Sequence, residues 1–253
     1  MHAIILAAGR GSRLAGHNPE GRPKCLLEVG GRSLLSRHLD LLNTLRIRRV
    51  DLVVGYEADQ IIEHVGNLHS RPEVAFHFNP RYEQGSVISL WAAHESLTQG
   101  SDTLLMDADV LYHPDILVRL AGTGHGNCYL LDRDFVPGDE PVKIAIRDGL
   151  MVDFRKKLDP DLAYDYLGES VGFFRFSAEM SQKLARECAR FDAEGLADAP
   201  HEEALRNLLL RESSEFSFED VTGLPWIEID FPEDVMRAKE QILPAIRQDF
   251  PGF

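Results

Sequence analysis

Apolar segments of strand length alternate with amphipathic segments of helix length through the first half of the chain, and this alternation restricts the fold most strongly. Buried-strand patterns cover residues 2–6, 50–54, 74–78 and 103–106. Helical patterns follow these strands over residues 33–45, 58–65, 86–97 and 114–120. Strands that alternate with helices form a mainly parallel sheet, because each helix carries the chain back across the sheet. The sequence therefore predicts a Rossmann-like α/β fold with helices on both faces of the sheet.

The pattern changes after about residue 125, where short strands are separated by Gly, Pro and Asp turns. Strand patterns cover residues 128–131, 142–146, 150–154 and 170–176, and helical patterns return over 178–191, 201–210 and 232–246. Asp148-Gly149 is a hairpin-type pair between two of these strands. No Gly/Ser/Pro-rich linker is visible, so a single domain is predicted over residues 1–253. Its parts are a first half (1–125), a small β-rich insertion (126–230) and a C-terminal helix (231–253).

The charge balance is acidic, with 27 Lys and Arg against 41 Asp and Glu and a formal net charge of −14. The phosphates of nucleic acid or of an anionic membrane would repel such a chain at long range, so neither is an expected partner. The apolar run over residues 3–8 is too short for a signal peptide or a membrane span, and no membrane insertion is expected. Small polyanions held by a few local cations are not excluded.

The cysteines indicate a reducing compartment. Cys25, Cys128 and Cys188 are scattered and lack any C-x-x-C spacing, so reduced thiols in a cytoplasmic protein are expected. The H-E pair at residues 201–202 begins like a metalloprotease H-E-x-x-H motif, but position 205 is Leu and the second ligand is missing. The sequence therefore predicts neither disulfides nor a zinc site.

A glycine loop with a local positive charge follows the first strand. It reads L-A-A-G-R-G-S-R over residues 6–13 and continues to Pro23-Lys24. Glycines let the backbone approach a ligand closely and present N–H groups to an anion. Residues 9–24 contain four cations and one anion, a local charge of +3: Arg10, Arg13, Arg22 and Lys24 against Glu20. Ligands of open α/β sheets bind at the carboxyl ends of the strands, so this loop is predicted to bind a small anion.

Two pairs of carboxylates end apolar segments. Asp107 and Asp109 follow the strand at 103–106, and Glu228 and Asp230 precede the last helix. Residues i and i+2 of an extended chain lie on the same side, so each pair presents its two carboxylates together. Carboxylate oxygens are hard ligands for Mg²⁺, which commonly uses one or two carboxylates plus a substrate phosphate. The pairs therefore predict a magnesium site.

The loop L-A-A-G-x-G-x-R followed by P-K resembles the signature loop of the nucleotidyltransferase superfamily that includes the sugar-1-phosphate nucleotidyltransferases. With the downstream aspartates, the resemblance covers nearly the whole chain. It implies that Arg13 and Lys24 contact the phosphates around the reacting α-phosphorus as catalytic cations. It also implies that Asp109 and Asp230 hold the magnesium and that Asp107 neighbours the nucleotide. The first half would bind the nucleotide, with a loop made of Leu6, Ala7, Ala8, Gly9, Gly11 and Ser12.

The segment N-P-R-Y-E-Q-G-S-V-I-S-L at residues 79–90 narrows the subfamily. Members of the superfamily bind the base of the nucleotide near such a Gly-containing turn before a helix. The resemblance therefore implies that Gln84, Gly85 and Ser86 contact the base here. The F-N-P-x-Y segment, the M-D-A-D strand and the closing I-E-I-D look most like cytidylyltransferases that activate phosphorylated alcohols. The resemblance implies CTP as one substrate and an acceptor of the phosphocholine, 2-aminoethylphosphonate or inositol-1-phosphate class as the other.

The acceptor is expected in the β-rich part. Lys143 and Lys156 supply cations there, and Lys156 falls where the family often has a lysine that contacts the acceptor's phosphate. Glu169 belongs to a group of acidic residues on the intervening loops, which suits a cationic head such as choline or aminoethyl. The expected partners are therefore CTP and a small phosphorylated or phosphonylated alcohol, and a homodimer is compatible with the sequence.

Other functions stay open on the sequence alone. The same loop serves sugar-1-phosphate uridylyl-, guanylyl- and thymidylyltransferases. Asp107-Ala108-Asp109 is a literal D-x-D of the kind found in metal-dependent glycosyltransferases, although that class does not explain residues 9–24. A non-catalytic nucleotide-binding regulatory protein would be favoured if Lys24 or the aspartates were replaced, and they are present.

Overall fold

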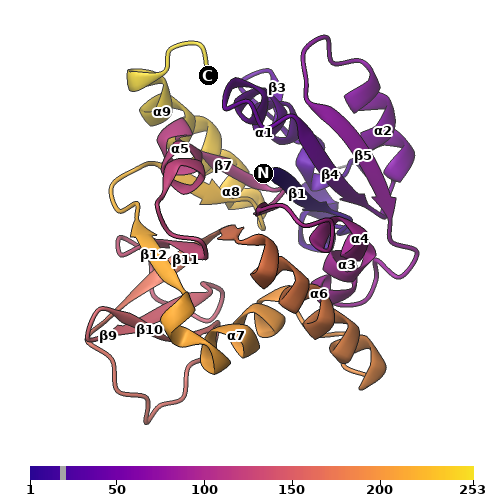
Figure 1. The fold of residues 1–253 in the computed structure, drawn as a ribbon. Coiled ribbons are helices and arrows are strands. Elements are labelled where there is room, and N and C mark those ends of the chain that lie inside the picture. Colours follow the sequence, from indigo (N-terminus) through magenta and orange to yellow (C-terminus); the bar gives the residue numbers. More distant parts are fainter. Residues whose placement is uncertain (18–20) are drawn as a thin grey trace.

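The computed structural model of the chain describes residues 1–17 and 21–253. Within these residues a nine-stranded mixed sheet runs through the centre, and helices cover both of its faces (Figure 1). The first half supplies four parallel strands in the order β6-β1-β4-β5. Their bounds are β1 His2–Ala7, β4 Arg49–Val54, β5 Glu73–Phe78 and β6 Thr103–Asp107. The predicted Rossmann-like parallel arrangement is confirmed.

The β-rich part extends this same sheet. Its long strand β11 (Tyr166–Phe176) pairs antiparallel with β6 and so joins the two halves of the chain. The strands β8, β9 and β10 are added through antiparallel pairs, and β12 runs parallel to β8. Their bounds are β8 Cys128–Asp132, β9 Lys143–Arg147, β10 Leu150–Arg155 and β12 Ser217–Asp220. The predicted hairpin at Asp148-Gly149 joins β9 to β10 with φ angles of 53° and 75°, as a type I′ turn requires.

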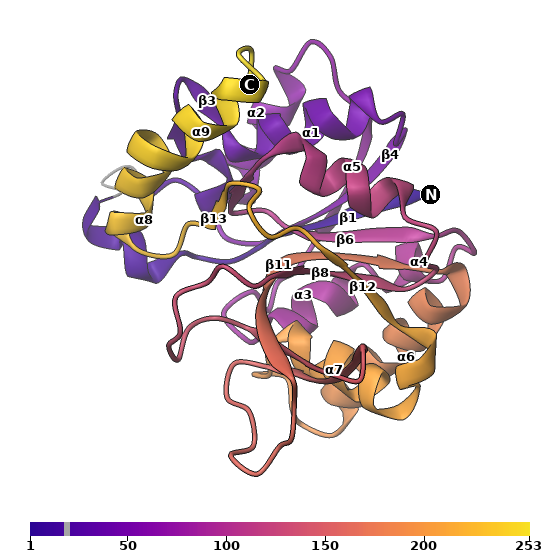
Figure 2. The same ribbon diagram turned by 90° about the vertical axis from the view of Figure 1, so that its left-hand side faces the viewer.

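Two hydrophobic cores lie on opposite faces of the sheet. Each lies between the sheet and the helices that cover that face (Figure 2). Successive side chains of a strand point to opposite faces, so Ile5 and Ala7 of β1 pack in one core and Ile4 in the other. The first core packs against α1 (Leu34–Thr44), α2 (Ala58–Gly66) and α5 (Pro114–Gly122). The second packs against α3 (Ser86–Ala92), α4 (His94–Leu97), α6 (Ala178–Ala193) and α7 (His201–Arg211).

The C-terminal helix packs on a third core beside the loop that follows β1. It consists of α8 (Pro232–Arg237), a π-helical segment (Ala238–Ile242) and α9 (Leu243–Asp249). Leu243 of α9 packs with Leu14 of the N-terminal loop. A small antiparallel sheet of β7 (Val110–Tyr112) and β13 (Trp226–Glu228) joins the same core. This packing brings residues 228–230 next to the N-terminal loop.

The structure departs from the predicted elements at short segments. The helix predicted at 86–97 is two helices, separated at Ala93 (φ −97°, ψ 20°), where His94 Nδ1 lies 3.0 Å from the Trp91 carbonyl oxygen. The sequence patterns do not predict β7, β12 or β13, because strands of three or four residues carry no clear periodicity. The same holds for the two-residue strands β2 (Glu28–Val29) and β3 (Arg32–Ser33). The 3₁₀ segments are Ser12–His17, Lys24–Leu26 and Ser213–Glu215.

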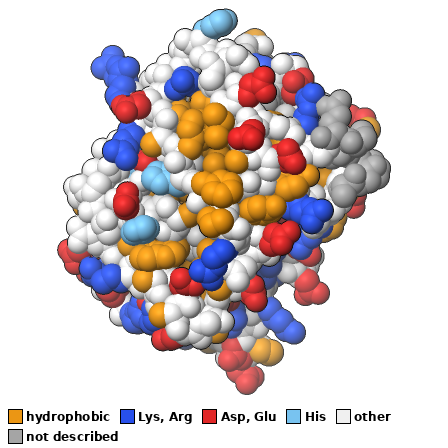
Figure 3. Space-filling view, turned by 90° about the vertical axis from the view of Figure 1, so that its right-hand side faces the viewer, with side chains coloured by type: hydrophobic (Ala, Val, Ile, Leu, Met, Phe, Trp, Pro, Cys, Tyr) orange, Lys and Arg blue, Asp and Glu red, His pale blue; other side chains and the backbone are white. Residues whose placement is uncertain are grey.

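One face of the molecule exposes hydrophobic side chains at the edge of the sheet (Figure 3). β5 is the edge strand there, and its Phe76 and Phe78 are 38% and 60% exposed. No helix among the described residues is long and apolar enough to cross a bilayer. The domain divisions at residues 125 and 230 and the homodimer stay predictions.

Candidate active site

The loop after β1 folds back over the carboxyl edge of the sheet and packs tightly on Lys24. Gly11 has a φ of 62°, and a Cβ atom at this position would lie 2.7 Å from Lys24 Cγ. Both the left-handed backbone and the close contact require glycine. The 3₁₀ turn Lys24–Leu26 follows Pro23 and fixes the Lys24 backbone. The glycine loop therefore positions Lys24 as well as exposing its own backbone.

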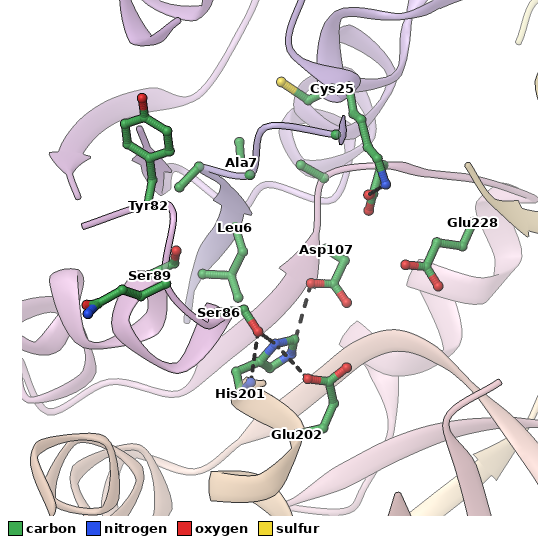
Figure 4. A pocket seen from close by; sticks show the side chains of 17 residues that line it. Leu6, Ala7, Cys25, Tyr82, Ser86, Ser89, Asp107, His201, Glu202 and Glu228 are labelled. Carbon is green, nitrogen blue, oxygen red and sulfur yellow. Dashed lines mark hydrogen bonds and ion pairs between the residues drawn. The ribbon is translucent and has the colours of Figure 1, made fainter. Parts of the chain in front are cut away.

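A cavity of about 250 Å³ opens where β1 and β6 end (Figure 4). Most of the residues predicted to bind the nucleotide line it: Leu6, Ala7, Ala8, Gly9, Gly11, Lys24, Gln84, Ser86 and Asp107. The predicted residues Ser12, Arg13 and Gly85 do not line it; Ser12 begins a 3₁₀ segment and Gly85 is the N-cap of α3. Sequence reasoning missed further lining residues: Cys25, Tyr82, Ser89, His201, Glu202 and Glu228.

The Lys24 ammonium lies between two carboxylates from distant parts of the chain. Lys24 Nζ is 3.1 Å from Asp109 Oδ2 and also donates to Asp230 Oδ1. Burial alone would lower the pKa of Lys24, but the two carboxylates outweigh burial and raise that pKa. Burial alone would raise the pKa of Asp230, and Lys24 lowers it. The ammonium and the Asp230 carboxylate therefore stay charged at neutral pH.

Arg13 lies at the outer rim of the site. Its Nη1 donates to Asp230 Oδ2 at 3.1 Å and to Glu140 Oε2 at 3.2 Å. The guanidinium carbon lies 5.1 Å from the centre of the Phe231 ring. Arg13 therefore links the N-terminal loop to the β-rich part and to the start of α8.

Asp109, Glu228 and Asp230 form an acidic cluster that can hold a divalent cation. Each offers a carboxylate oxygen, and these oxygens lie within 4.8 Å of one another. The surrounding protein raises the pKa of Glu228, and the carboxylates of Asp109 and Asp230 raise it further, although the side chain still reaches solvent. Three hard oxygen donors fit an ion such as Mg²⁺. Glu228 was not among the predicted ligands, although its i, i+2 spacing from Asp230 was the available signal.

Asp107 packs against the backbone of β11. Gly172 of that strand has a φ of 80°, and a Cβ atom there would lie 2.5 Å from Asp107 Oδ2. Burial raises the pKa of Asp107, and the carboxylates of Asp109 and Glu202 raise it further. Asp107 lines the cavity at the ends of β1 and β6 without belonging to the acidic cluster.

A second cavity of about 250 Å³ lies beside the first, and Glu228 lines both. Among the described residues that line it, the charged ones are acidic apart from Arg237: Asp132, Asp134, Glu140, Glu169, Glu228, Asp230 and Asp234. Burial raises the pKa of Glu169 to about 7, and the nearby carboxylate of Asp132 contributes. Trp226 Nε1 donates to Asp132 Oδ2 at 2.7 Å. This cavity therefore concentrates negative charge.

The two lysines predicted to bind the acceptor differ in their contacts. Lys156 Nζ lies 3.2 Å from Glu140 Oε2, and Lys156 lines a small cavity that shares Glu228 with both larger ones. Lys143 Nζ donates to the carbonyl oxygens of Gly138 at 2.7 Å and of Lys156 at 2.6 Å. Lys143 therefore holds the loop before β9, whereas the Lys156 side chain stays at the small cavity beside the two larger ones.

The chain is similar along its length to three enzymes, and the names of two of them specify CMP or CTP. It is 27% identical over 252 residues to the CMP-5'-(3-aminopropyl)phosphonate synthase of Streptomyces rubellomurinus, covering 98% of this chain and 40% of that protein. It is 22% identical over 255 residues to the CTP:phosphoglutamine cytidylyltransferase of Campylobacter jejuni, covering 93% and 98%. It is 28% identical over 244 residues to a bifunctional IPC transferase and DIPP synthase of Rubrobacter xylanophilus, covering 95% and 52%. The chain thus spans about half or less of two of these three relatives.

Two solved structures share the fold. The inositol-1-phosphate CTP transferase from T. maritima matches with a TM-score of 0.74 at 20% identity, covering 95% of this chain and 97% of that chain. The CTP:phosphocholine cytidylyltransferase from Streptococcus pneumoniae matches with a TM-score of 0.72 at 20% identity, covering 94% and 97%. Residues 3–142, more than half of the chain, match the family described as the MobA-like NTP transferase domain. The expected nucleotidyltransferase membership is confirmed: the chain belongs to the MobA-like NTP transferase family.

Proposed function

We propose that this chain is a cytidylyltransferase, which transfers CMP from CTP to a phosphorylated or phosphonylated alcohol and releases pyrophosphate. The observation that carries the proposal is that Lys24, Asp109 and Asp230 meet beside the cavity at the ends of β1 and β6 and beside a second, acidic cavity. The relatives whose names specify CTP support the choice of nucleotide. The three cysteines are free thiols, which supports a cytoplasmic location.

The proposed reaction is one displacement at phosphorus. An oxygen of the acceptor's phosphate or phosphonate attacks the α-phosphorus of CTP and forms a new P–O bond. The bond from the α-phosphorus to the bridging oxygen of the β-phosphate breaks, and pyrophosphate leaves with the electron pair. The second pKa of a phosphate monoester is about 6, so the attacking oxygen is anionic at neutral pH and needs no general base. The protein has to hold two polyanions in line and relieve their repulsion.

The cations of the site suit this task. Lys24 stands at the cavity and Arg13 at its rim, so both add positive charge where the two substrates would meet. Members of the family generally use a divalent metal. We propose Mg²⁺, held by Asp109, Glu228 and Asp230, which when bound would stabilise negative charge on the phosphates. In the structure as it stands, Lys24 balances two of these carboxylates.

The acidic cavity favours an acceptor with an ammonium group. Glu169 of β11 is the register partner of Asp132 on β8, and the Asp132 carboxylate adds to the effect of burial in raising the pKa of Glu169. A cationic group placed there would relieve this repulsion, whereas an uncharged polyol would not. Lys156 and Arg13 both contact Glu140 at one side of the cavity and could bind the anionic end of the same acceptor. An aminoalkyl phosphate or phosphonate therefore fits the charge distribution best.

The metal assignment can be tested through CTP-dependent pyrophosphate release, with 2-aminoethylphosphonate as the acceptor and MgCl₂ varied. Asp109→Asn and Asp230→Asn should each remove the Mg²⁺-dependent rate, because each loses one anionic ligand. Asp59→Asn, at an exposed position on α2, serves as the matched control and should keep the wild-type rate. Full rate at limiting Mg²⁺ in either site variant would show that these aspartates do not hold the metal.

A further inference from the structure

His201 reaches from the β-rich part of the chain into the wall of the cavity at the ends of β1 and β6 (Figure 4). It is the first residue of α7 and only 3% exposed. Its ring nitrogen Nε2 is buried and has no hydrogen-bond partner among the described residues. A buried nitrogen without a partner costs free energy unless a ligand or water satisfies it. A bound ligand in the cavity would give Nε2 the partner that the described residues do not supply.

The contacts around the ring define which nitrogen carries a hydrogen. Ser86 Oγ accepts the backbone N–H of His201 at 2.8 Å and lies 3.0 Å from His201 Nδ1. On the other side of the ring, Nε2 lies 4.0 Å from Asp107 Oδ1. Ser86 Oγ already accepts the backbone N–H, so its own hydrogen is available to donate to Nδ1. With Nδ1 accepting from Ser86, the neutral ring carries its hydrogen on Nε2.

Glu202 does not change this assignment. Its Oε2 is 3.2 Å from His201 Nδ1 but makes no hydrogen bond. If the ring were protonated on both nitrogens, Nε2 would carry a hydrogen as well. In both cases Nε2–H is a donor buried in the cavity wall.

The surroundings indicate which part of a nucleotide this donor would meet. Lys24 marks the end of the cavity that can accept phosphates, because its ammonium lies there beside Asp109. Asp107 and Glu202 surround His201 with carboxylates, which would repel a phosphate. A neutral acceptor atom, such as the ribose 2′-oxygen or N3 of cytosine, carries no such penalty.

We infer that His201 is a specificity-determining residue, which donates Nε2–H to an acceptor atom of the bound nucleoside while Ser86 holds its ring. The inference rests on the proposed function, since it assumes that CTP occupies this cavity. It assigns a role to the H-E pair at residues 201–202, which lacks the spacing of a metal motif.

The test is the Kd of CTP measured by calorimetry in the presence of MgCl₂, a readout that does not require turnover. His201→Phe removes the donor and should weaken CTP binding about tenfold, the usual effect of losing one buried hydrogen bond. His201→Gln keeps an N–H donor and should recover much of the affinity. His94→Phe, at a histidine that stacks on Trp91 outside the cavity, is the matched control and should bind like the wild type. Thermal unfolding of each variant checks that the fold is intact.

Two further nucleotides locate the acceptor atom. If His201 contacts the ribose 2′-oxygen, His201→Phe should shrink the preference for CTP over 2′-deoxy-CTP. If it contacts N3 of the base, which is an acceptor in cytosine but carries a hydrogen in uracil, the same variant should shrink the preference for CTP over UTP. Loss of either preference supports the inference. Unchanged ratios, or wild-type affinity in His201→Phe, would overturn it. A wild-type protein that binds no CTP would instead contradict the proposed function.

Discussion

Lys24 is the residue whose charge holds the site together. Its ammonium contacts Asp109 and Asp230, and the loop that positions it depends on glycine at position 11. Without this ammonium the two carboxylates would stand uncompensated and repel the phosphates of a nucleotide. Lys24 therefore offsets negative charge in the acidic cluster, and this allows a polyanion to bind in the cavity.

Replacing this ammonium should affect catalysis far more than folding. Lys24→Ala is expected to slow CTP-dependent pyrophosphate release by about 100–1000-fold, as removal of a preorganised charge commonly does. Lys239→Ala, at an exposed lysine of the C-terminal helix, is the matched control and should keep the wild-type rate. Near-wild-type turnover in Lys24→Ala, with an intact fold by circular dichroism, would show that the Lys24 ammonium does not take part in catalysis.

Helix α1 supports the turn between Asp107, the last residue of β6, and Asp109. His38 of α1 is fully buried, with Nε2 3.3 Å from the Ala108 carbonyl oxygen and Nδ1 3.2 Å from the Tyr112 hydroxyl. Burial lowers the pKa of His38 to about 4. The folded protein therefore keeps this imidazole neutral at neutral pH.

The buried histidine predicts a pH dependence of stability. An unfolded histidine has a pKa of about 6.5, so between about pH 6.5 and pH 4 the unfolded chain binds more protons and stability falls as the pH falls. Between about pH 7 and pH 4.5 the wild type should lose about 2 kcal/mol more unfolding free energy than His38→Gln, which cannot titrate. Urea unfolding at both pH values measures the difference. Equal losses in the two proteins would contradict the neutral buried histidine.

Strand β11 makes room for Asp107 by means of a glycine. Gly172→Ala would force a left-handed φ on alanine and place its Cβ against the Asp107 carboxylate, so CTP binding should weaken about tenfold. Gly149→Ala imposes the same kind of backbone strain in open space, at the β9–β10 turn. Both variants should lose about 1–2 kcal/mol of stability, measured by urea unfolding, but only Gly172→Ala should change the Kd of CTP. Equal Kd values in both would show that Asp107 is not placed by this contact.

For the molecule as a whole, the alternation of strands and helices was sufficient to predict the parallel half of the sheet and its helical layers. The role of β11 as the strand that joins both halves was not predictable, because antiparallel pairing with β6 has no local signature. The glycine loop and the aspartates were found because they form short motifs. His201 was missed as a site residue, because its partner Ser86 lies 115 residues earlier and no spacing rule connects them. Tertiary contacts of this kind exist only once the sheet has formed.

The most direct test of the account is a panel of four nucleoside triphosphates with an ammonium-bearing acceptor, 2-aminoethylphosphonate, and its uncharged analogue propylphosphonate. Pyrophosphate release and the mass of the nucleotide product would be measured for the wild type, for Glu169→Gln, and for Glu233→Gln as an exposed control outside the acidic cavity. We expect a CMP-linked product from CTP and a preference for the ammonium-bearing acceptor. That preference should fall about tenfold in Glu169→Gln alone. Transfer from another nucleotide, or no transfer to either acceptor, would contradict the proposed function.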